Sequence, residues 1–359
     1  MPAYMADTLP AFRALGLERG AVKPWEDGLR TDPNEVSYEW WYFDAHLEDG
    51  TALVIGFHTK HMLNPAGPLS PMVIVDLDRP DGTNIKRELV FSPEEFSASE
   101  QGCDVRIAAN TFAGDLRSYR IHVEDEQFSA DVTLTRTAPS WRPETGHMYF
   151  GDGQGTGEGL FAWVPTVPEG TVEATLTVDG VQETLRGIGY HDHNWGDAPM
   201  NQLIHHWWWG RAKVGPYTVI ASFITAEEQF GADTIPIIMI AKEGRIIADD
   251  GKRLTFSTAD THTDDYTGKP VAARQVYDYA GPEGHLRVTW NREQDILRHN
   301  FVDDLDEARR EAARAAGFDP SYLRFTGTAT VERFEEGEVV ETHSAPAIWE
   351  LMYFGRARG

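Results

Sequence analysis

The segment Gly189–Gly196, which reads GYHDHNWG, holds the densest group of chemically capable residues in the chain. If the segment is extended, alternation separates its side chains into two groups: His191, His193 and Trp195 on one face, and Tyr190, Asp192 and Asn194 on the other. Two imidazoles and an indole facing a cavity can transfer protons and contact an apolar ligand. In the structural alternative, Asp192 and Asn194 shape a turn and the histidines bond buried backbone. These residues alone leave both interpretations open.

A metal ion is a third possibility for this segment. A His-x-His pair on a strand directs both imidazoles to one side, which suits a transition metal. His205 and His206 lie near enough in the sequence to supplement the pair. No carboxylate stands at a recognisable metal-binding spacing, however. We therefore predict no metal here.

Two tryptophan-rich blocks, Glu39–Phe43 and His206–Arg211, are the second feature with possible chemistry. In the first block, alternation places Glu39, Trp41 and Phe43 on one face of the strand. In the second block, it places Trp207, Trp209 and Arg211 on one face, and His206 and Trp208 on the other. Aromatic residues at this spacing are usually core, but Trp on both faces also suits a barrel with an aromatic-lined hollow. Such a lining would accept a large apolar ligand and stabilise a carbocation. Glu39 and Arg211 would need partners there, and a structural salt bridge between them would satisfy both.

The tryptophan blocks also belong to an internal repeat. With one residue of gap, the aligned pairs are Trp40 with Trp207, Ala45 with Ala212, and Phe57 with Phe223. The sequence MYFG occurs at 148–151 and again at 352–355. Internal similarity of this kind suggests two copies of one unit. We predict an N-terminal domain of residues 25–195 and a C-terminal domain of residues 196–359.

The elements that would position these residues are mostly short β-strands. They are rich in β-branched residues and separated by turn signals: Thr51–Phe57, Met72–Leu77, Tyr119–Val123, Phe128–Leu134 and Val172–Val178. The pattern is typical of all-β antiparallel sandwiches or barrels. One helix is expected at Asp303–Ala316, which begins with acids and stops at Gly317, and a short one at Leu9–Leu17.

Composition excludes several classes of partner. The 359 residues carry a formal net charge of -25, which repels nucleic acid and anionic membrane surfaces. Cys103 is the single cysteine, so no intrachain disulfide can form, and a cytoplasmic protein fits.

Met1–Gly20 lacks a signal-peptide pattern, and no apolar run approaches the roughly 20 residues of a membrane helix. Phosphate-binding loops, dinucleotide fingerprints and nucleophile elbows are absent from the sequence.

Taken together, these pieces resemble the two-domain lipocalin-like family that includes carotenoid 1,2-hydratase (hydroxyneurosporene synthase) and the AttH-like proteins. The matching pieces span nearly the whole chain: Glu39–Phe43, Gly189–Gly196, Trp207–Arg211 and Ile348–Gly355. The resemblance implies two calycin-like antiparallel barrels packed together, with one or two peripheral helices and the ligand bound between the barrels. It also implies hydration or Diels–Alderase-type cyclisation without an organic cofactor.

The hydratase pattern of this family carries over to His193 and Trp195. It also expects a Tyr-x-Asp pair in the strand after the second tryptophan block. Tyr217 is present there, but no Asp lies between it and Phe223. Asp192 is then the nearest candidate acid by sequence.

These observations predict a cofactor-free hydratase for a prenyl, terpenoid or carotenoid-like alkene. Asp192 or a protonated His193 would donate the proton, and His191 would order the water. The remaining predicted contacts to the apolar substrate are Trp195, Trp41, Trp207, Trp209, Tyr190, Tyr217, Glu39 and Arg211. A cyclase for a polyene and a non-catalytic carrier of an apolar ligand are the alternatives. No nucleic-acid partner and no stable membrane insertion are expected.

Overall fold

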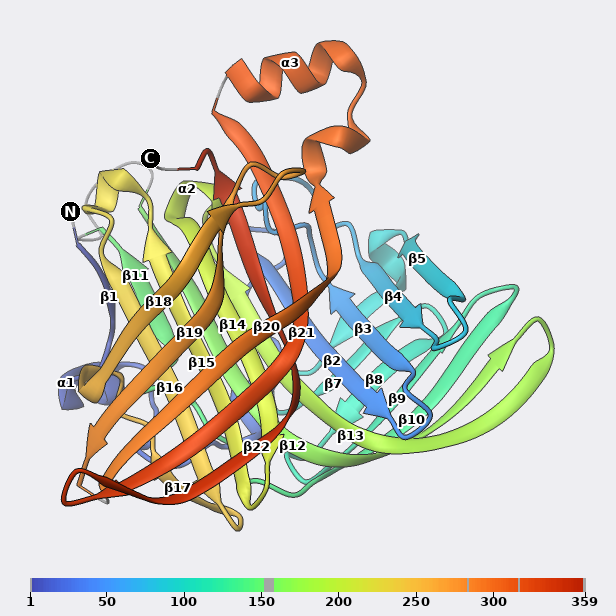
Figure 1. Cartoon of the computed structure of the whole chain (residues 1–359). Helices are drawn as coiled ribbons and strands as arrows, with labels where there is room; N and C mark the ends of the chain where they lie inside the picture. The colour runs from blue at the N-terminus through green and yellow to red at the C-terminus, as the bar shows by residue number, and fades with distance from the viewer. Residues whose placement is uncertain (1, 152–157, 283, 316, 358–359) are drawn as a thin grey trace. The chain divides into compact units, whose positions relative to one another are not determined.

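The chain folds almost entirely into β-strands, as its sequence predicts. The computed structural model describes residues 2–151, 158–282, 284–315 and 317–357. Two antiparallel sheets account for the strands of this part of the chain (Figure 1). By contacts, the chain divides into an N-terminal unit, Met5–Tyr149 with the chain up to Met200, and a C-terminal unit from Asn201 on. The C-terminal unit also takes in residues 2–4 and residues 150–151.

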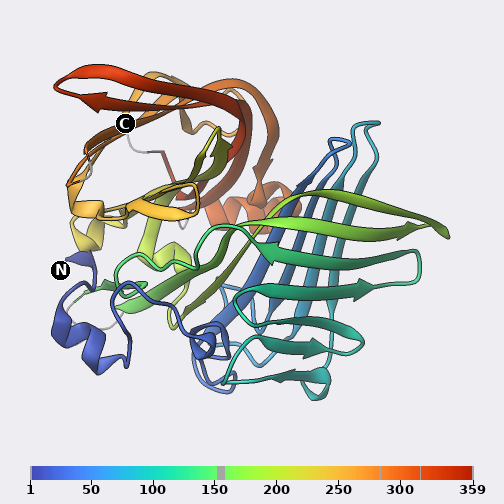
Figure 2. The same ribbon diagram turned by 90° about the horizontal axis from the view of Figure 1, so that it is seen from below.

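The N-terminal sheet curls into a half-barrel (Figure 2). Its strands follow the order β5 (Asn84–Val90), β4 (Met72–Asp78), β3 (Ala52–His58), β2 (Tyr38–Leu47), β13 (Val181–Gly196), β12 (Gly159–Val178), β10 (Phe128–Arg136), β9 (Ser118–Glu124), β8 (Asn110–Gly114), β7 (Asp104–Ile107) and β6 (Phe96–Ala98). Off this path, β1 (Ala3–Met5) pairs with β11 (His147–Phe150), which also pairs with β12. The sheet therefore ends at β5 and at β6.

The C-terminal sheet repeats this arrangement with fewer strands. Its order is β17 (Arg245–Ala248), β16 (Thr234–Lys242), β15 (Tyr217–Ala226), β14 (Ile204–Val214), β22 (Glu338–Gly355), β21 (Phe318–Glu335), β20 (Gly284–Asn300), β19 (Pro270–Gly281) and β18 (Leu254–Thr263). Near its two ends, β16 contacts β18, so the sheet curls back on itself (Figure 2).

Strand order supports the equivalence of the two tryptophan blocks. In both sheets the block occupies a central strand, β2 or β14, which pairs with the following hairpin strand and with the late strand β13 or β22. The MYFG repeat does not join equivalent strands, because 148–151 belongs to β11 and its edge whereas 352–355 ends the central strand β22. That second similarity therefore does not mark equivalent positions in the two sheets.

Each sheet encloses its own apolar core. The N-terminal core gathers Trp41, Phe43, Ala45 and Leu47 from β2 with the inward residues of its neighbours. The C-terminal core gathers Trp208, Trp290 and Trp349 with smaller residues. Gly210 makes room there, because a Cβ at this position would lie 2.7 Å from the Cβ of Trp349. The inward residues follow the two-residue period of a strand.

The helices are short and differ in detail from their predicted ranges. They are α1 (Leu9–Ala14), α2 (Met200–Leu203) and α3 (Glu307–Ala315), with 3-10 turns η1 (Pro24–Asp27), η2 (Pro93–Glu95), η3 (Glu228–Phe230), η4 (Gly251–Arg253) and η5 (Phe301–Asp304). The helix expected from Asp303 begins only at Glu307, because Asp306 caps it by accepting from the Arg309 amide at 2.9 Å. Thr8 caps α1 in the same way. Among the described residues, no helix has the length and apolarity to cross a bilayer.

Candidate functional site

The predicted alternation along Tyr190–Trp195 is confirmed by the hydrogen bonds of β13. This strand lies between β2 and β12 and pairs Trp41 with His193 and Phe43 with His191. The side chains of His191 and His193 bond to groups on η1 and β2. Asp192 bonds instead to Tyr190, Asn194 and Trp163. The three predicted catalytic residues therefore lie on opposite faces of one strand.

His193 is wholly buried and bonded at both ring nitrogens. Its Nδ1 lies 3.1 Å from the carbonyl oxygen of Glu26, and its Nε2 lies 2.7 Å from Oε1 of Glu39. The indole of Trp41 stacks on the ring at 4.7 Å with an interplanar angle of 8°. Both nitrogens therefore face hydrogen-bond acceptors, a backbone carbonyl and a carboxyl group, and the ring is fixed in one orientation.

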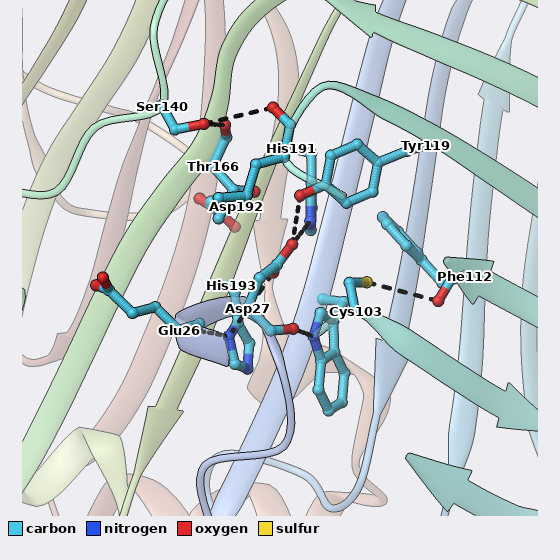
Figure 3. Close-up of polar contacts among 12 residues, drawn as sticks. Glu26, Asp27, Cys103, Phe112, Tyr119, Ser140, Thr166, His191, Asp192 and His193 are labelled. Atoms are coloured by element: carbon cyan, nitrogen blue, oxygen red, sulfur yellow. Dashed lines mark hydrogen bonds and ion pairs between the residues drawn. The ribbon is translucent and has the colours of Figure 1, made fainter. Parts of the chain in front are cut away.

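His191, two residues before His193 and on the same face of β13, has a similar environment. Its Nδ1 donates to the carbonyl oxygen of Tyr42 at 2.8 Å, and its Nε2 lies 3.2 Å from Oδ2 of Asp27. The ring packs between Phe112 and Tyr119, at 4.7 and 4.6 Å between centroids. Figure 3 shows His191 and the Tyr119 hydroxyl converging on Asp27.

One partner of each histidine comes from a segment that the sequence did not single out. The turn η1 lies against β13 and inserts the buried acids Glu26 and Asp27 into the core. Glu26 forms a buried ion pair with Arg142, and burial raises the pKa of the carboxyl although the Arg142 charge opposes this. The Trp41 indole donates to the Asp27 carbonyl at 3.0 Å. No spacing rule connects these residues to β13, because about 165 residues separate them.

Glu39 shares this network rather than facing an open cavity. Its carboxylate accepts from the amides of Arg30 and Thr31 at 2.7 and 2.8 Å, and from the Thr31 hydroxyl at 2.7 Å. The carboxylate is also the partner of His193. Its role is thus to hold the chain after η1 against β2 and β13.

Asp192, on the other face, is the group best suited to move a proton. Its Oδ2 accepts from the Tyr190 hydroxyl and the Trp163 indole, each at 2.7 Å, and its Oδ1 accepts from the Asn194 amide at 2.6 Å. Burial raises the pKa of Asp192 to about 6, although these three donors and His191 oppose the rise. A carboxyl that titrates near neutral pH can act as a general acid or base.

The remaining predicted contacts are divided between core and half-buried positions. Trp41 lies in the N-terminal core, and Trp195 packs on Ala162 and Val164, with its ring 4.9 Å from that of His193. In the C-terminal unit, Trp208 faces the core, whereas Trp207, Trp209 and Arg211 lie half-buried on the other face of β14. Trp207 donates to Glu350 at 3.0 Å.

Tyr217 lies apart from the tryptophans of its own unit. It pairs with Val214 at the hairpin end of β15, whereas Trp207 pairs with Ile224. Seven residues of antiparallel strand correspond to roughly 24 Å, so Tyr217 and Trp207 cannot contact one small ligand together. The indole of Trp163 donates a hydrogen bond to Asp192. Trp163 was not among the predicted substrate contacts.

Metal-ligating side chains gather at one place within the described residues. One ligand atom each from Asp27, Cys103 and His191 lies within 4.8 Å of the other two. His191 and His193 both approach the Asp27 carboxylate, at 3.2 Å to Oδ2 and 3.8 Å to Oδ1, and His193 lies closer still to Glu39, at 2.7 Å. The Nδ1 atoms of His205 and His206 contact one another at 2.8 Å, and His205 also bonds the Arg356 carbonyl.

Sequence comparisons connect the chain to enzymes of small-molecule chemistry. A family profile described as "DA-like: Diels-Alderase-like" matches residues 29–283. The quinolone epoxide rearrangement protein asqO of Emericella nidulans is 24% identical over 212 residues, which are 52% of this chain and 54% of that protein. The hydroxyneurosporene dehydrogenase of Chlorobaculum tepidum is 30% identical over 204 residues, 49% of this chain and 53% of that protein. The chain thus spans about half the length of these curated relatives.

Solved structures agree over nearly the whole fold. An AttH protein from Nitrosomonas europaea has a TM-score of 0.59 at 16% identity, covering 98% of this chain and 100% of that one. The structure of CghA with Sch210972 has a TM-score of 0.63 at 15% identity, covering 93% and 96%. These identities establish the fold alone. The resemblance to AttH-like proteins inferred from sequence is confirmed at that level.

Proposed function

Because the chain belongs to the Diels-Alderase-like family, we propose that it is an enzyme acting on an apolar small molecule through proton transfer at Asp192. The reaction that this residue suits best is addition of water to a trisubstituted alkene of a prenyl or terpenoid substrate. The observation that carries the proposal is a buried carboxyl whose pKa is raised to about 6.

The proposed first step is protonation of the alkene by the Asp192 carboxyl. The proton bonds to the less substituted carbon, and the π electrons leave a tertiary carbocation on the other carbon. At pH 7 roughly a tenth of the Asp192 population holds the proton, because one pH unit above the pKa is a tenfold change. The hydrogen bonds from Tyr190 and Trp163 keep the carboxyl in one orientation.

The second step is capture of the carbocation by water. The oxygen of a water molecule bonds to the cationic carbon, and the proton it loses returns to the Asp192 carboxylate, which restores the catalyst. The aromatic rings around Asp192 can stabilise the cation through their π-faces. Trp163 packs edge-on against Trp141 at 6.0 Å, and Tyr190 packs edge-on against Tyr42 at 6.3 Å. Tyr190 remains a phenol, because burial and the nearby Asp192 charge raise its pKa well above the usual range.

Substitution of Asp192 by Asn tests this assignment. We expect turnover of an alkene substrate to fall by about 10²–10⁴, since Asn cannot donate a proton to carbon. Asp131→Asn, an acid on β10 that pairs with His122, is the matched control and should leave turnover unchanged. In the wild type, turnover should decline about tenfold per pH unit above pH 6. A fully active Asp192→Asn variant would end the proposal.

Cyclisation of a polyene is the second candidate, and the Diels-Alderase-like profile favours it. The side chains around the substrate would then hold the polyene in a folded conformation, and the hydrogen-bond donors around Asp192 would polarise the polyene. Turnover of a panel of acyclic terpene and polyene substrates in ¹⁸O-labelled water separates the two reactions. Hydration gives a product heavier by one labelled water, whereas cyclisation gives an unlabelled isomer. Tight binding without any conversion would instead identify a carrier.

A further inference from the structure

The cluster of Asp27, Cys103 and His191 has no part in the proton transfer proposed for Asp192. Its members come from three separate places in the N-terminal unit: the turn η1, the residue preceding β7, and β13. All three are buried, with exposed fractions of 1%, 4% and 0% respectively. They lie beside Phe112 and Tyr119 in the apolar core, where an uncompensated charge is costly (Figure 3).

The hydrogen bonding of His191 resembles that of a metal ligand. Its Nδ1 donates to the Tyr42 carbonyl at 2.8 Å, which is the outer contact that commonly orients a metal-bound imidazole. Its Nε2 then faces the Asp27 carboxylate at 3.2 Å. Charge-assisted hydrogen bonds between nitrogen and oxygen are usually about 2.7–2.9 Å long. Two ligands on a tetrahedral zinc ion, each about 2.0–2.1 Å from the metal, are roughly 3.3 Å apart.

Cys103 and Asp27 supply the charges that such an ion requires. The Cys103 thiol is buried close to the Asp27 carboxylate, where only a bound cation would stabilise its thiolate form. The Sγ atom of Cys103 makes a long hydrogen bond, 3.5 Å, to the Phe112 carbonyl. The Oδ1 atom of Asp27 is buried and has no hydrogen-bond partner within the described chain. His193 Nδ1 lies 3.8 Å from that atom.

We propose that Asp27, Cys103 and His191 form a buried site for one divalent cation of the zinc class. A thiolate, a carboxylate and a neutral imidazole neutralise a dication, so the loaded site adds no net charge to the core. Binding displaces the thiol proton, and any proton on His191 Nε2, to solvent. The three ligand atoms, now within 4.8 Å of one another, would contract by roughly 1 Å around the ion. The Tyr119 hydroxyl, which donates to Asp27, or a water molecule completes the coordination.

The consequence of this site is mechanical rather than catalytic. Asp27 belongs to η1, whereas His191 lies in β13 and Cys103 directly precedes β7 of the curled sheet. The cation would therefore cross-link η1 to the N-terminal sheet and stabilise the position of η1 and of the chain that follows it. The site uses none of the hydrogen bonds that hold Asp192, which lies on the opposite face of β13.

Zinc binding by the full chain tests the proposal. The protein is stripped with a chelator, re-equilibrated with Zn²⁺, and assayed for metal content and for melting temperature. We expect one zinc per chain and a higher melting temperature than in the stripped protein. Cys103→Ser and Asp27→Asn should each weaken zinc binding at least tenfold in competition with a chromophoric chelator. His122→Ala, which removes a partly exposed histidine paired with Asp131, is the control and should bind as the wild type does.

Cobalt substitution keeps the test decisive if a core variant folds poorly. Co²⁺ in the wild-type site should give a thiolate-to-cobalt charge-transfer absorption, which requires the bond to Cys103. Chain-stoichiometric zinc together with this absorption supports the site. The proposal is overturned if zinc stays substoichiometric, if the absorption is absent, or if a folded Cys103→Ser variant retains full affinity.

Discussion

The two sheets place very different residues at corresponding central positions. In the N-terminal sheet, His193 lies opposite Trp41 and His191 opposite Phe43. In the C-terminal sheet, Leu351 lies opposite Trp208 and Trp349 opposite Gly210. One strand order thus accommodates either an ionic centre or an apolar one. The difference follows from η1, which brings Glu26 and Asp27 to the N-terminal centre as partners for the histidines.

The sharpest test of this difference is to give the N-terminal centre the residue of the C-terminal one. His193→Leu leaves the buried Glu39 carboxyl group without its imidazole partner, so we expect a loss of about 3–5 kcal/mol in the free energy of unfolding. Urea denaturation measures this loss.

Removing the second charge should reverse part of that effect. The double variant His193→Leu/Glu39→Gln should recover at least half of the lost stability, because no unpaired charge remains buried. If the single and double variants were equally unstable, packing rather than charge would distinguish the two centres.

On the opposite face of β13, removal of a charge should stabilise the protein. Burial raises the pKa of Asp192 from 3.8 to about 6, so the folded chain retains a proton that the unfolded chain releases between about pH 4 and 6. Stability therefore falls across that window as the pH rises. Asp192→Asn should match the wild type near pH 4 and exceed it by about 2–3 kcal/mol at pH 7. A gain that does not vary with pH in urea titrations would exclude titration of Asp192 as its cause.

The C-terminal centre should instead be sensitive to added volume. Gly210→Ala places a methyl group 2.7 Å from the Trp349 Cβ, and we expect a loss of about 1–3 kcal/mol. Thermal unfolding at pH 5 and pH 8 should show the same loss, since no titrating group is involved. A strongly pH-dependent loss would show that the apolar centre is coupled to charges.

Ion pairs on the surface should not distinguish the two units. Arg186→Ala, which breaks an exposed pair with Glu173 in the N-terminal unit, should cost less than about 1 kcal/mol. Arg274→Ala, which breaks the pair with Asp260 in the C-terminal unit, should cost equally little. Chemical denaturation of both variants therefore provides the baseline for the core substitutions. A larger loss in one unit would mean that the contrast extends beyond the interiors.

Local regularity explains which features the sequence could predict. The two-residue period of a strand separated His193 from Asp192 correctly, and it placed Trp208 apart from Trp207. Turn residues and β-branched runs located four of the five strands given above within two residues, as β4 and β9 illustrate, whereas β12 begins 13 residues before the predicted Val172. Both signals act within a few residues, so they survive without any knowledge of tertiary contacts.

Long-range contacts account for what the sequence did not reveal. Asp27 reaches His191 across 164 positions, and Trp163 meets Asp192 only because β12 pairs with β13. Whether a histidine is a core residue or a catalytic one depends on such partners. The predicted start of α3, at Asp303, is too early, because acidic residues are favoured both in the first turn of a helix and at its cap. Asp306 is the cap, and the helix begins after it.

The open curl of the N-terminal sheet has a consequence for self-association. Its order ends at β5, where backbone groups could pair with a strand from another chain. Lys86, Arg87 and Glu88 occupy the middle of β5, and stacking a second strand on it would crowd these charges or strip their water. The charged residues of β5 thus oppose edge-to-edge pairing between chains. They are the residues to preserve when the protein is engineered for use at high concentration.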